Sequence, residues 1–203
     1  MTHSQLKLEP RAAFADLPVK AAGRGVVVQE RDEMGLASVL ARRGHHDSLM
    51  KQVRERFGID LPPGPRRSAA GDCAFIASGP GAWFATVEGA GNGFVTSLTD
   101  ALGEYAAIAD QSDGQAVLRV SGPKAREALC KLVPIDLHPR IFRSGDVSVT
   151  AAAHIGATLW RLDDDPSGHA VFEIAVFRSL AESFWTALSE SAAEFGVEMN
   201  GRD

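Results

Sequence analysis

The chain has few cysteines, no long apolar run and no excess of basic charge, and each shortage excludes a class of protein. Its 203 residues include only two cysteines, Cys73 and Cys130. They lie far apart and outside any Cys-x-x-Cys or Cys/His spacing, so neither a zinc site nor a disulfide framework is indicated. Both fall within apolar periodic segments, which predicts two buried, reduced thiols in a cytosolic protein.

Charge and hydropathy exclude two kinds of partner. Residues 1–10 lack the apolar core of a signal peptide, and no uncharged apolar run approaches the ~20 residues that span a bilayer. The formal net charge of −5 argues against a nucleic-acid partner, which favours a clustered basic surface. We therefore expect a soluble, cytoplasmic protein with neither a membrane nor a nucleic acid as partner.

Motifs of the common nucleotide-binding and hydrolytic sites are also missing. The glycines of 79–81 and 89–93 form no Gly-x-Gly-x-x-Gly or Gly-Lys-Ser/Thr pattern, so hairpin turns and a helix entry explain them. No Gly-x-Ser-x-Gly elbow occurs. The sequence therefore indicates neither a mononucleotide or dinucleotide site nor a serine nucleophile on a strained turn.

What is present is an ordinary globular composition, with 45% hydrophobic and 23% charged residues, enough to bury a real core. Hydrophobic periodicity and turn residues divide this chain into strands and helices. The predicted strands are 26–29, 73–78, 82–87, 105–109, 115–120, 147–152, 158–162, 170–176 and 197–199, and the predicted helices are 34–42 (a turn), 48–57, 94–102, 123–133 and 180–192.

The two halves repeat one order of elements, namely strand, helix, two or more strands, helix, strand. This order predicts an α+β fold of two ferredoxin-like lobes, each a split β-α-β arrangement. The predicted organisation is an N-terminal arm over 1–22, a first lobe over 23–110 and a second lobe over 111–203. The polar, proline-punctuated arm is either frayed or laid along another chain.

The stretch from Asp110 to Leu129 is the most informative part of the chain. Ala116, Leu118 and Val120 alternate with polar or outward residues as in a half-buried strand. The strand stops at Ser121-Gly122-Pro123, where glycine permits a bend and proline presets a first helical turn. The stretch therefore predicts a turn, a strand and a helix in immediate succession.

This stretch resembles the glycine-cleavage T-protein family of folate-binding aminomethyltransferases, whose first domain has an Asp-x-Ser segment, a strand and a Ser-Gly-Pro-x-Ala helix start. Within that family it is most similar to the gamma subunits of heterotetrameric sarcosine oxidases. The segments that carry the resemblance are 109–123, 134–139, 153–156, 159–162 and 178–185. The resemblance implies a fold like the T-protein folate-binding domain.

The resemblance also implies a function. It suggests a noncatalytic structural gamma subunit, with the alpha, beta and delta subunits of sarcosine oxidase as partners and alpha as the closest. No cofactor is expected in this chain, while FAD, FMN, NAD and tetrahydrofolate are expected in the other subunits. Such a complex oxidises sarcosine with oxygen to glycine and hydrogen peroxide, and releases formaldehyde or 5,10-methylenetetrahydrofolate.

No catalytic, cofactor-binding or metal-binding residue is expected in this chain. In the aminomethyltransferases that it resembles, a glycine pair leads to an Asp-Asp segment whose carboxylate positions the folate nitrogen. The matching segment, 154–160, keeps one glycine and neither acid. His154 is a possible base, or else a core or interface histidine. The alternative function, an independent tetrahydrofolate-binding aminomethyltransferase-like protein, would need Asp110 or Asp113 to replace the lost carboxylate.

Three further features have a chemical and a structural interpretation. Two adjacent histidines beside an aspartate at 45–47 suggest a metal, but neighbouring residues on a helix point ~100° apart and rarely share an ion. The acidic segment 163–168 is a turn rather than a calcium loop, because it contains Asp-Pro and Ser-Gly pairs. Trp83, Trp160 and Trp185 are either interface anchors or core residues.

A ferredoxin-like regulatory or assembly module that binds no folate is a third functional hypothesis for the chain.

Overall fold

The computed structural model of the chain describes residues 11–14, 17, 22–89 and 93–200. Its strands are β1 Ala22–Glu30, β2 Gly35–Ala41, β3 Arg67–Ala70, β4 Cys73–Gly79, β5 Ala82–Val87, β6 Ala106–Asp110, β7 Gln115–Ser121, β8 Val147–Ala152, β9 Ile155–Arg161, β10 Phe172–Phe177 and β11 Val197–Asn200. Its helices are α1 His46–Phe57, α2 Phe94–Leu102, α3 Ala125–Cys130 and α4 Ala181–Ala192, with a 3-10 turn at Arg178–Leu180. None of the helices described is long and apolar enough to cross a membrane.

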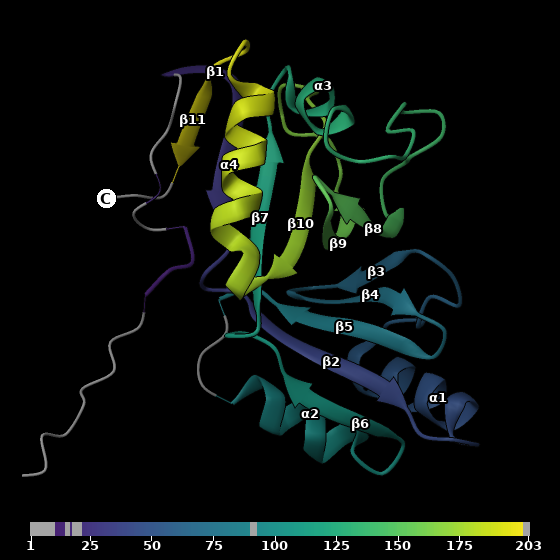
Figure 1. Ribbon diagram of the computed structural model, residues 1–203. Coiled ribbons are helices and arrows are strands. Elements are labelled where there is room, and N and C mark those ends of the chain that lie inside the picture. Colours follow the sequence, from purple (N-terminus) through teal and green to yellow (C-terminus); the bar gives the residue numbers. More distant parts are fainter. Residues whose placement is uncertain (1–10, 15–16, 18–21, 90–92, 201–203) are drawn as a thin grey trace, which may run out of the picture.

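Two sheets, each with helices on one face, make up two lobes (Figure 1). In the six-stranded lobe the order is β11-β1-β7-β10-β9-β8, with β11 parallel to β1 and the other neighbours antiparallel. Helices α3 and α4 pack on this sheet around a core that includes Leu118, Leu129, Phe172 and Phe184. The lobe is thus a helix layer on a twisted sheet, as the α+β class requires.

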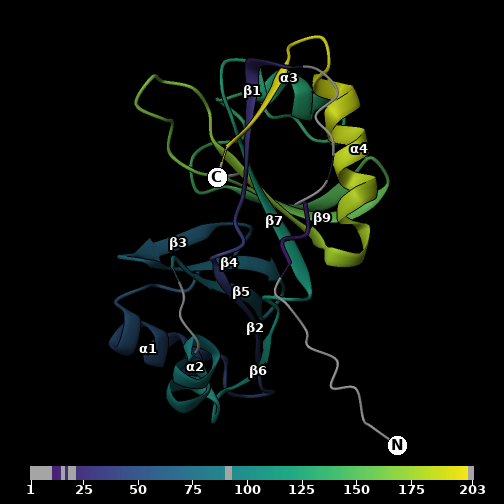
Figure 2. The same cartoon turned by 90° about the vertical axis from the view of Figure 1, so that its left-hand side faces the viewer.

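The five-stranded lobe has the order β3-β4-β5-β2-β6, with every neighbouring pair antiparallel. Helices α1 and α2 pack on it around a second core that includes Leu49, Val53, Phe75 and Leu98. The chain crosses between the lobes twice, over 31–34 and 111–114, and Figure 2 shows one lobe above the other.

The helix-free faces of the two sheets meet each other. Their contact is a third buried cluster, which both sheets contribute: Met34, Leu36, Ile76, Val117, Val147, Trp160 and Ala175. Because Leu36 and Ile76 are at most 2% exposed, the lobes share a continuous apolar interface rather than a solvated hinge.

The predicted α+β class and most elements are confirmed. The hairpin turn at 79–81 separates β4 from β5, and Gly58 ends α1 in the left-handed conformation at a φ of 67°. Helix α1 begins at His46 without a side-chain cap, so the predicted capping by Asp47 or Ser48 is wrong. Helix α3 is shorter than the predicted 123–133.

Three elements differ from the sequence prediction. The predicted helical turn at 34–42 is strand β2, whose two faces both meet apolar layers, so that it lacks a clean period-two pattern. Strand β1 pairs with β7 and β11, so residues 23–30 belong to the six-stranded lobe and not to the predicted first lobe. Strand β3 has no counterpart in the prediction.

Most of the predicted N-terminal arm, 1–22, lies outside the described residues. In the described part Phe14 is fully buried and belongs to the core of the six-stranded lobe. The backbone N–H groups of Ala13 and Phe14 donate to the Glu30 carboxylate at 2.6 and 3.1 Å. Residues 13–14 therefore pack on their own chain.

Candidate functional site at the lobe junction

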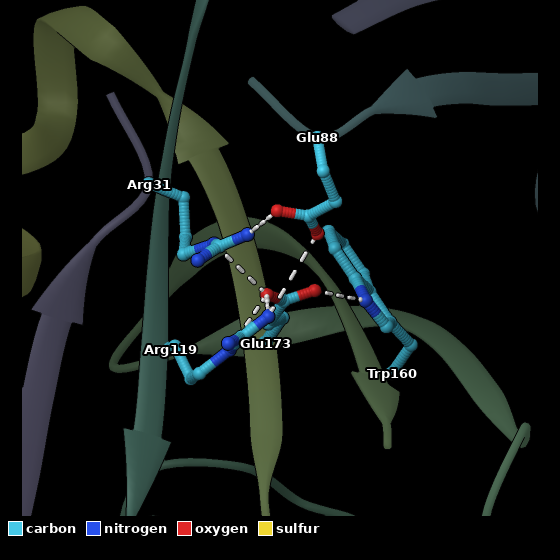
Figure 3. Close-up of polar contacts among 5 residues, drawn as sticks. All are labelled: Arg31, Glu88, Arg119, Trp160 and Glu173. Carbon is cyan, nitrogen blue, oxygen red and sulfur yellow. Dashed lines mark hydrogen bonds and ion pairs between the residues drawn. The ribbon is translucent and has the colours of Figure 1, made fainter. Parts of the chain in front are cut away.

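A buried glutamate, Glu173, is the centre of the polar contacts between the lobes (Figure 3). It lies on β10 directly opposite Arg119 of β7 and directly opposite Trp160 of β9. The three side chains therefore form a row across the helix-free face of the six-stranded sheet. Since Glu173 is 3% exposed, its charge needs partners within the protein.

Both oxygens of the Glu173 carboxylate have partners within the protein. Oε1 accepts from Arg119 Nε at 3.0 Å and Nη2 at 2.7 Å, and it lies 3.2 Å from Arg31 Nε. Oε2 accepts from Trp160 Nε1 at 2.8 Å. These charge-assisted bonds hold Arg119, Arg31 and Trp160 around the carboxylate.

The five-stranded lobe contributes charges to the same place. Glu88, which follows β5, is paired with Arg31 and lies 3.9 Å from Arg119 Nη2. Burial lowers the pKa of the Arg67 guanidinium on β3, and the attraction of Glu173 and Glu88 opposes this shift. We call these five residues, Arg31, Arg67, Glu88, Arg119 and Glu173, the charged cluster.

A cavity of about 620 Å³ adjoins the charged cluster at Arg31. Its lining includes Glu30, whose pKa is raised mainly by burial, and both Ser112 and Asp113 of the second crossing segment. The Ser112 hydroxyl donates to the carbonyl of Leu36 at 3.3 Å and accepts from the N–H of Leu36 at 3.2 Å. The hydroxyl thus joins the second crossing segment to β2 through both of these bonds.

His154 is neither a core histidine nor close to the charged cluster. It is exposed at the tight turn between β8 and β9, where Ala153 and His154 have φ values of 49° and 69°. Positive φ at both central residues is the geometry of a type I′ hairpin turn. The interpretation as a core histidine is therefore wrong, because the apolar pattern belongs to the residues on either side of the turn.

The two candidate replacement carboxylates are exposed. Asp110 Oδ1 accepts the backbone N–H of Ser112 at 2.9 Å, which makes a local turn of the kind that aspartate favours. Asp113 lies in the next turn and lines the 620 Å³ cavity. Asp113 therefore shares the lining of this cavity with Ser112 and with two further carboxylates, those of Glu30 and Asp32.

The other candidate segments are explained by local contacts. The His45 ring lies 6.0 Å from the Tyr105 ring, and the His46 ring lies 5.8 Å from the Trp83 ring, so the two histidines face different neighbours. In the segment 163–168, Asp163 accepts from Ser144, Asp164 from Arg161, and Asp165 from the backbone of Ser167 and His169. Each carboxylate stabilises a separate part of the turn.

The tryptophans are core residues. Trp83, Trp160 and Trp185 are each at most 2% exposed, so the interpretation as interface anchors is wrong.

The charged cluster was not predicted from the sequence. Arg119 and Glu173 are charged residues inside otherwise apolar strands, which is the only signal, and it does not reveal that β7 and β10 are neighbours.

The two cysteines differ, which gives a testable contrast. Cys130 is exposed, contrary to the prediction of two buried thiols, while burial raises the pKa of the half-buried Cys73 to about 11.

The two thiols are expected to react at different rates. The thiolate is the reactive form, so at pH 8 an aromatic disulfide reagent should modify Cys73 at least ~10 times more slowly than Cys130. Absorbance of the released thiol measures both rates. The Cys130→Ser variant should lose the fast phase, and equal rates in the native protein would contradict the assignment.

A family model and a sequence relative agree on one family. The model of the "Sarcosine oxidase, gamma subunit family" matches residues 44–194. A sarcosine oxidase subunit gamma from Arthrobacter sp. is 30% identical over 165 residues, covering 78% of this chain and 78% of that relative.

Two solved structures share the fold. One is heterotetrameric sarcosine oxidase from Corynebacterium sp. U-96 in complex with pyrrole 2-carboxylate, with a TM-score of 0.76, 26% identity, and coverage of 93% of this chain and 97% of that chain. The other is glycine cleavage system aminomethyltransferase T from Bartonella henselae, with a TM-score of 0.61, 13% identity, and coverage of 88% of this chain and 48% of that chain. The expected T-protein-like fold is confirmed, although this chain matches only about half of that aminomethyltransferase.

Proposed function

The chain belongs to the sarcosine oxidase gamma subunit family, and on this premise we propose that it is a noncatalytic structural subunit of a heterotetrameric sarcosine oxidase. The observation that carries the proposal is the end-to-end likeness to one chain of a heterotetrameric sarcosine oxidase. The contacts of the Glu173 carboxylate support the noncatalytic part, because this buried charge pairs with Arg119 and Trp160 of neighbouring strands.

In this proposal the chain associates with the alpha, beta and delta subunits, alpha being its closest neighbour, in the cytoplasm. FAD, FMN, NAD and tetrahydrofolate reside in the other subunits, and this chain binds none of them. The complex oxidises sarcosine to glycine and hydrogen peroxide, with formaldehyde or 5,10-methylenetetrahydrofolate as the one-carbon product. The two free thiols are compatible with a reducing compartment.

An independent tetrahydrofolate-binding aminomethyltransferase-like protein is the alternative. The cavity of about 620 Å³ beside Asp113 favours it, since this volume is within the range of small-molecule sites. Against it, segment 154–160 contains no acid, and Asp110 is used in a local turn. The carboxylates that line the cavity, those of Glu30, Asp32 and Asp113, all lie outside the segment that matches the Asp-Asp of the aminomethyltransferases.

Co-expression with the neighbouring genes tests the proposal. A tag on this chain is expected to recover a flavoprotein with bands at about 370 and 450 nm, fixed subunit stoichiometry and sarcosine-dependent peroxide formation. Expression of the other genes without this chain is the matched control, and should yield less assembled complex. A solitary, colourless chain that binds tetrahydrofolate would instead establish the alternative.

A further inference from the structure

A second cavity, of about 260 Å³, lies on the helix-covered side of the six-stranded lobe. Its lining comes from three separate segments that carry the family resemblance: Gly122 and Pro123 at the end of β7, Pro139 in the following loop, and Arg161 at the end of β9. Nothing in the proposed subunit role accounts for why these segments converge on a cavity.

Arg161 is a buried cation in the wall of this cavity. Its side chain is 8% exposed, and it donates from Nη1 to the Phe142 carbonyl at 2.9 Å and from Nη2 to Asp164 Oδ1 at 2.6 Å. Its Nε–H is buried and has no acceptor among the described residues. A buried guanidinium donor without an acceptor costs free energy, so the local contacts of Arg161 do not use all of its donors.

Arg126 of α3 adds a second guanidinium to the lining. Its Nε donates to the Leu137 carbonyl at 2.9 Å, and no carboxylate of the described part of the chain lies within ion-pair distance of it. His169 also lines the cavity, with Nδ1 3.3 Å from Asp165. The lining thus holds two guanidinium groups and one carboxylate, that of Asp164, which pairs with Arg161 and leaves the charge of Arg126 to face the cavity lining.

We propose that this cavity binds an oxyanion, the carboxylate or phosphate group of a small anion or of an acidic side chain from a partner subunit. Arginine presents forked donors that match both groups, and charge-assisted bonds of this kind are about twice as strong as neutral ones. The volume lies below the ~300 Å³ at which drug-sized sites begin, so the cavity accepts a single anionic group and not a nucleotide.

The test uses the full chain labelled with ¹⁵N and titrated with inorganic phosphate and, separately, with acetate. The Nε–H resonances of Arg161 and Arg126 are expected to shift saturably, with half-saturation on the order of 1 mM. Arg126→Gln should weaken this binding at least tenfold, and Arg126→Lys should fall between it and the unmodified chain. Arg140→Gln is the matched control, since Arg140 is exposed in the same loop and does not line the cavity.

A second arm separates the two sources of the anionic group. If neither ion binds the isolated chain but Arg126→Gln, unlike Arg140→Gln, reduces recovery of the assembled complex at least tenfold, the oxyanion is a partner carboxylate. Backbone amide spectra establish that each variant is folded, and Arg126→Lys replaces Arg126→Gln if the latter unfolds. The proposal is overturned if phosphate and acetate bind the Arg126 variants as tightly as the unmodified chain. It is also overturned if neither ion binds and Arg126→Gln leaves the recovery of the assembled complex unchanged.

Discussion

Replacing Glu173 by glutamine is expected to lower the free energy of unfolding by ~3–5 kcal/mol, because it removes one partner of a buried set of ion pairs. Arg119 would lose two bonds to a charged oxygen, and Arg31 would lose its buried counter-ion. A glutamine amide N–H₂ would also face donors, so one of these contacts becomes donor against donor. The half-exposed Glu88 cannot compensate both arginines.

Urea denaturation followed by tryptophan fluorescence measures this effect, since Trp160 donates to Glu173 and reports on the lobe junction. The midpoint should fall while the slope stays constant, because the surface exposed on unfolding is unchanged. The matched control is Glu33→Gln, an exposed glutamate in the first crossing segment, which should alter stability by no more than ~0.5 kcal/mol. A Glu173→Gln effect as small as the control would show that the charged cluster does not hold the lobes together.

Local signals in the sequence are sufficient for much of the fold. The apolar stripe of α2, the turn at 79–81 and the left-handed Gly58 depend on residues close in sequence, and periodicity and turn chemistry predict them. The Ser121-Gly122-Pro123 junction is predicted for the same reason: Gly122 has a φ of 99°, which glycine adopts without strain.

What the sequence could not provide is pairing between distant segments. Strand β1 has the same local pattern whichever sheet it joins, and only its bonds with β7 and β11 place it in the six-stranded lobe. Glu173 and Arg119 become one site because β10 and β7 are neighbours in register. The sequence alone shows that segment 154–160 contains no acid, but it does not show that the Glu173 carboxylate is buried between β7 and β9.

Replacing Phe14 by alanine is expected to cost ~3–5 kcal/mol of stability, although the residue lies near the N-terminus. Its ring is fully buried, with its centroid 6.3 Å from that of Trp185 on α4. Removing the ring leaves a cavity beside α4 and frees the backbone donors that Ala13 and Phe14 present to the half-buried Glu30 carboxylate. A frayed arm or one laid along another chain would predict almost no change in the isolated protein.

Phe177→Ala is the matched control, because this phenylalanine is 57% exposed at the end of β10. Its loss removes little buried surface, so thermal or urea unfolding should change by less than ~1 kcal/mol. If both variants unfold at the same midpoint, Phe14 contributes nothing to the isolated chain and its packing depends on a partner. If only Phe14→Ala is destabilised, residues 13–14 are part of the core on which the six-stranded lobe depends before any other subunit binds.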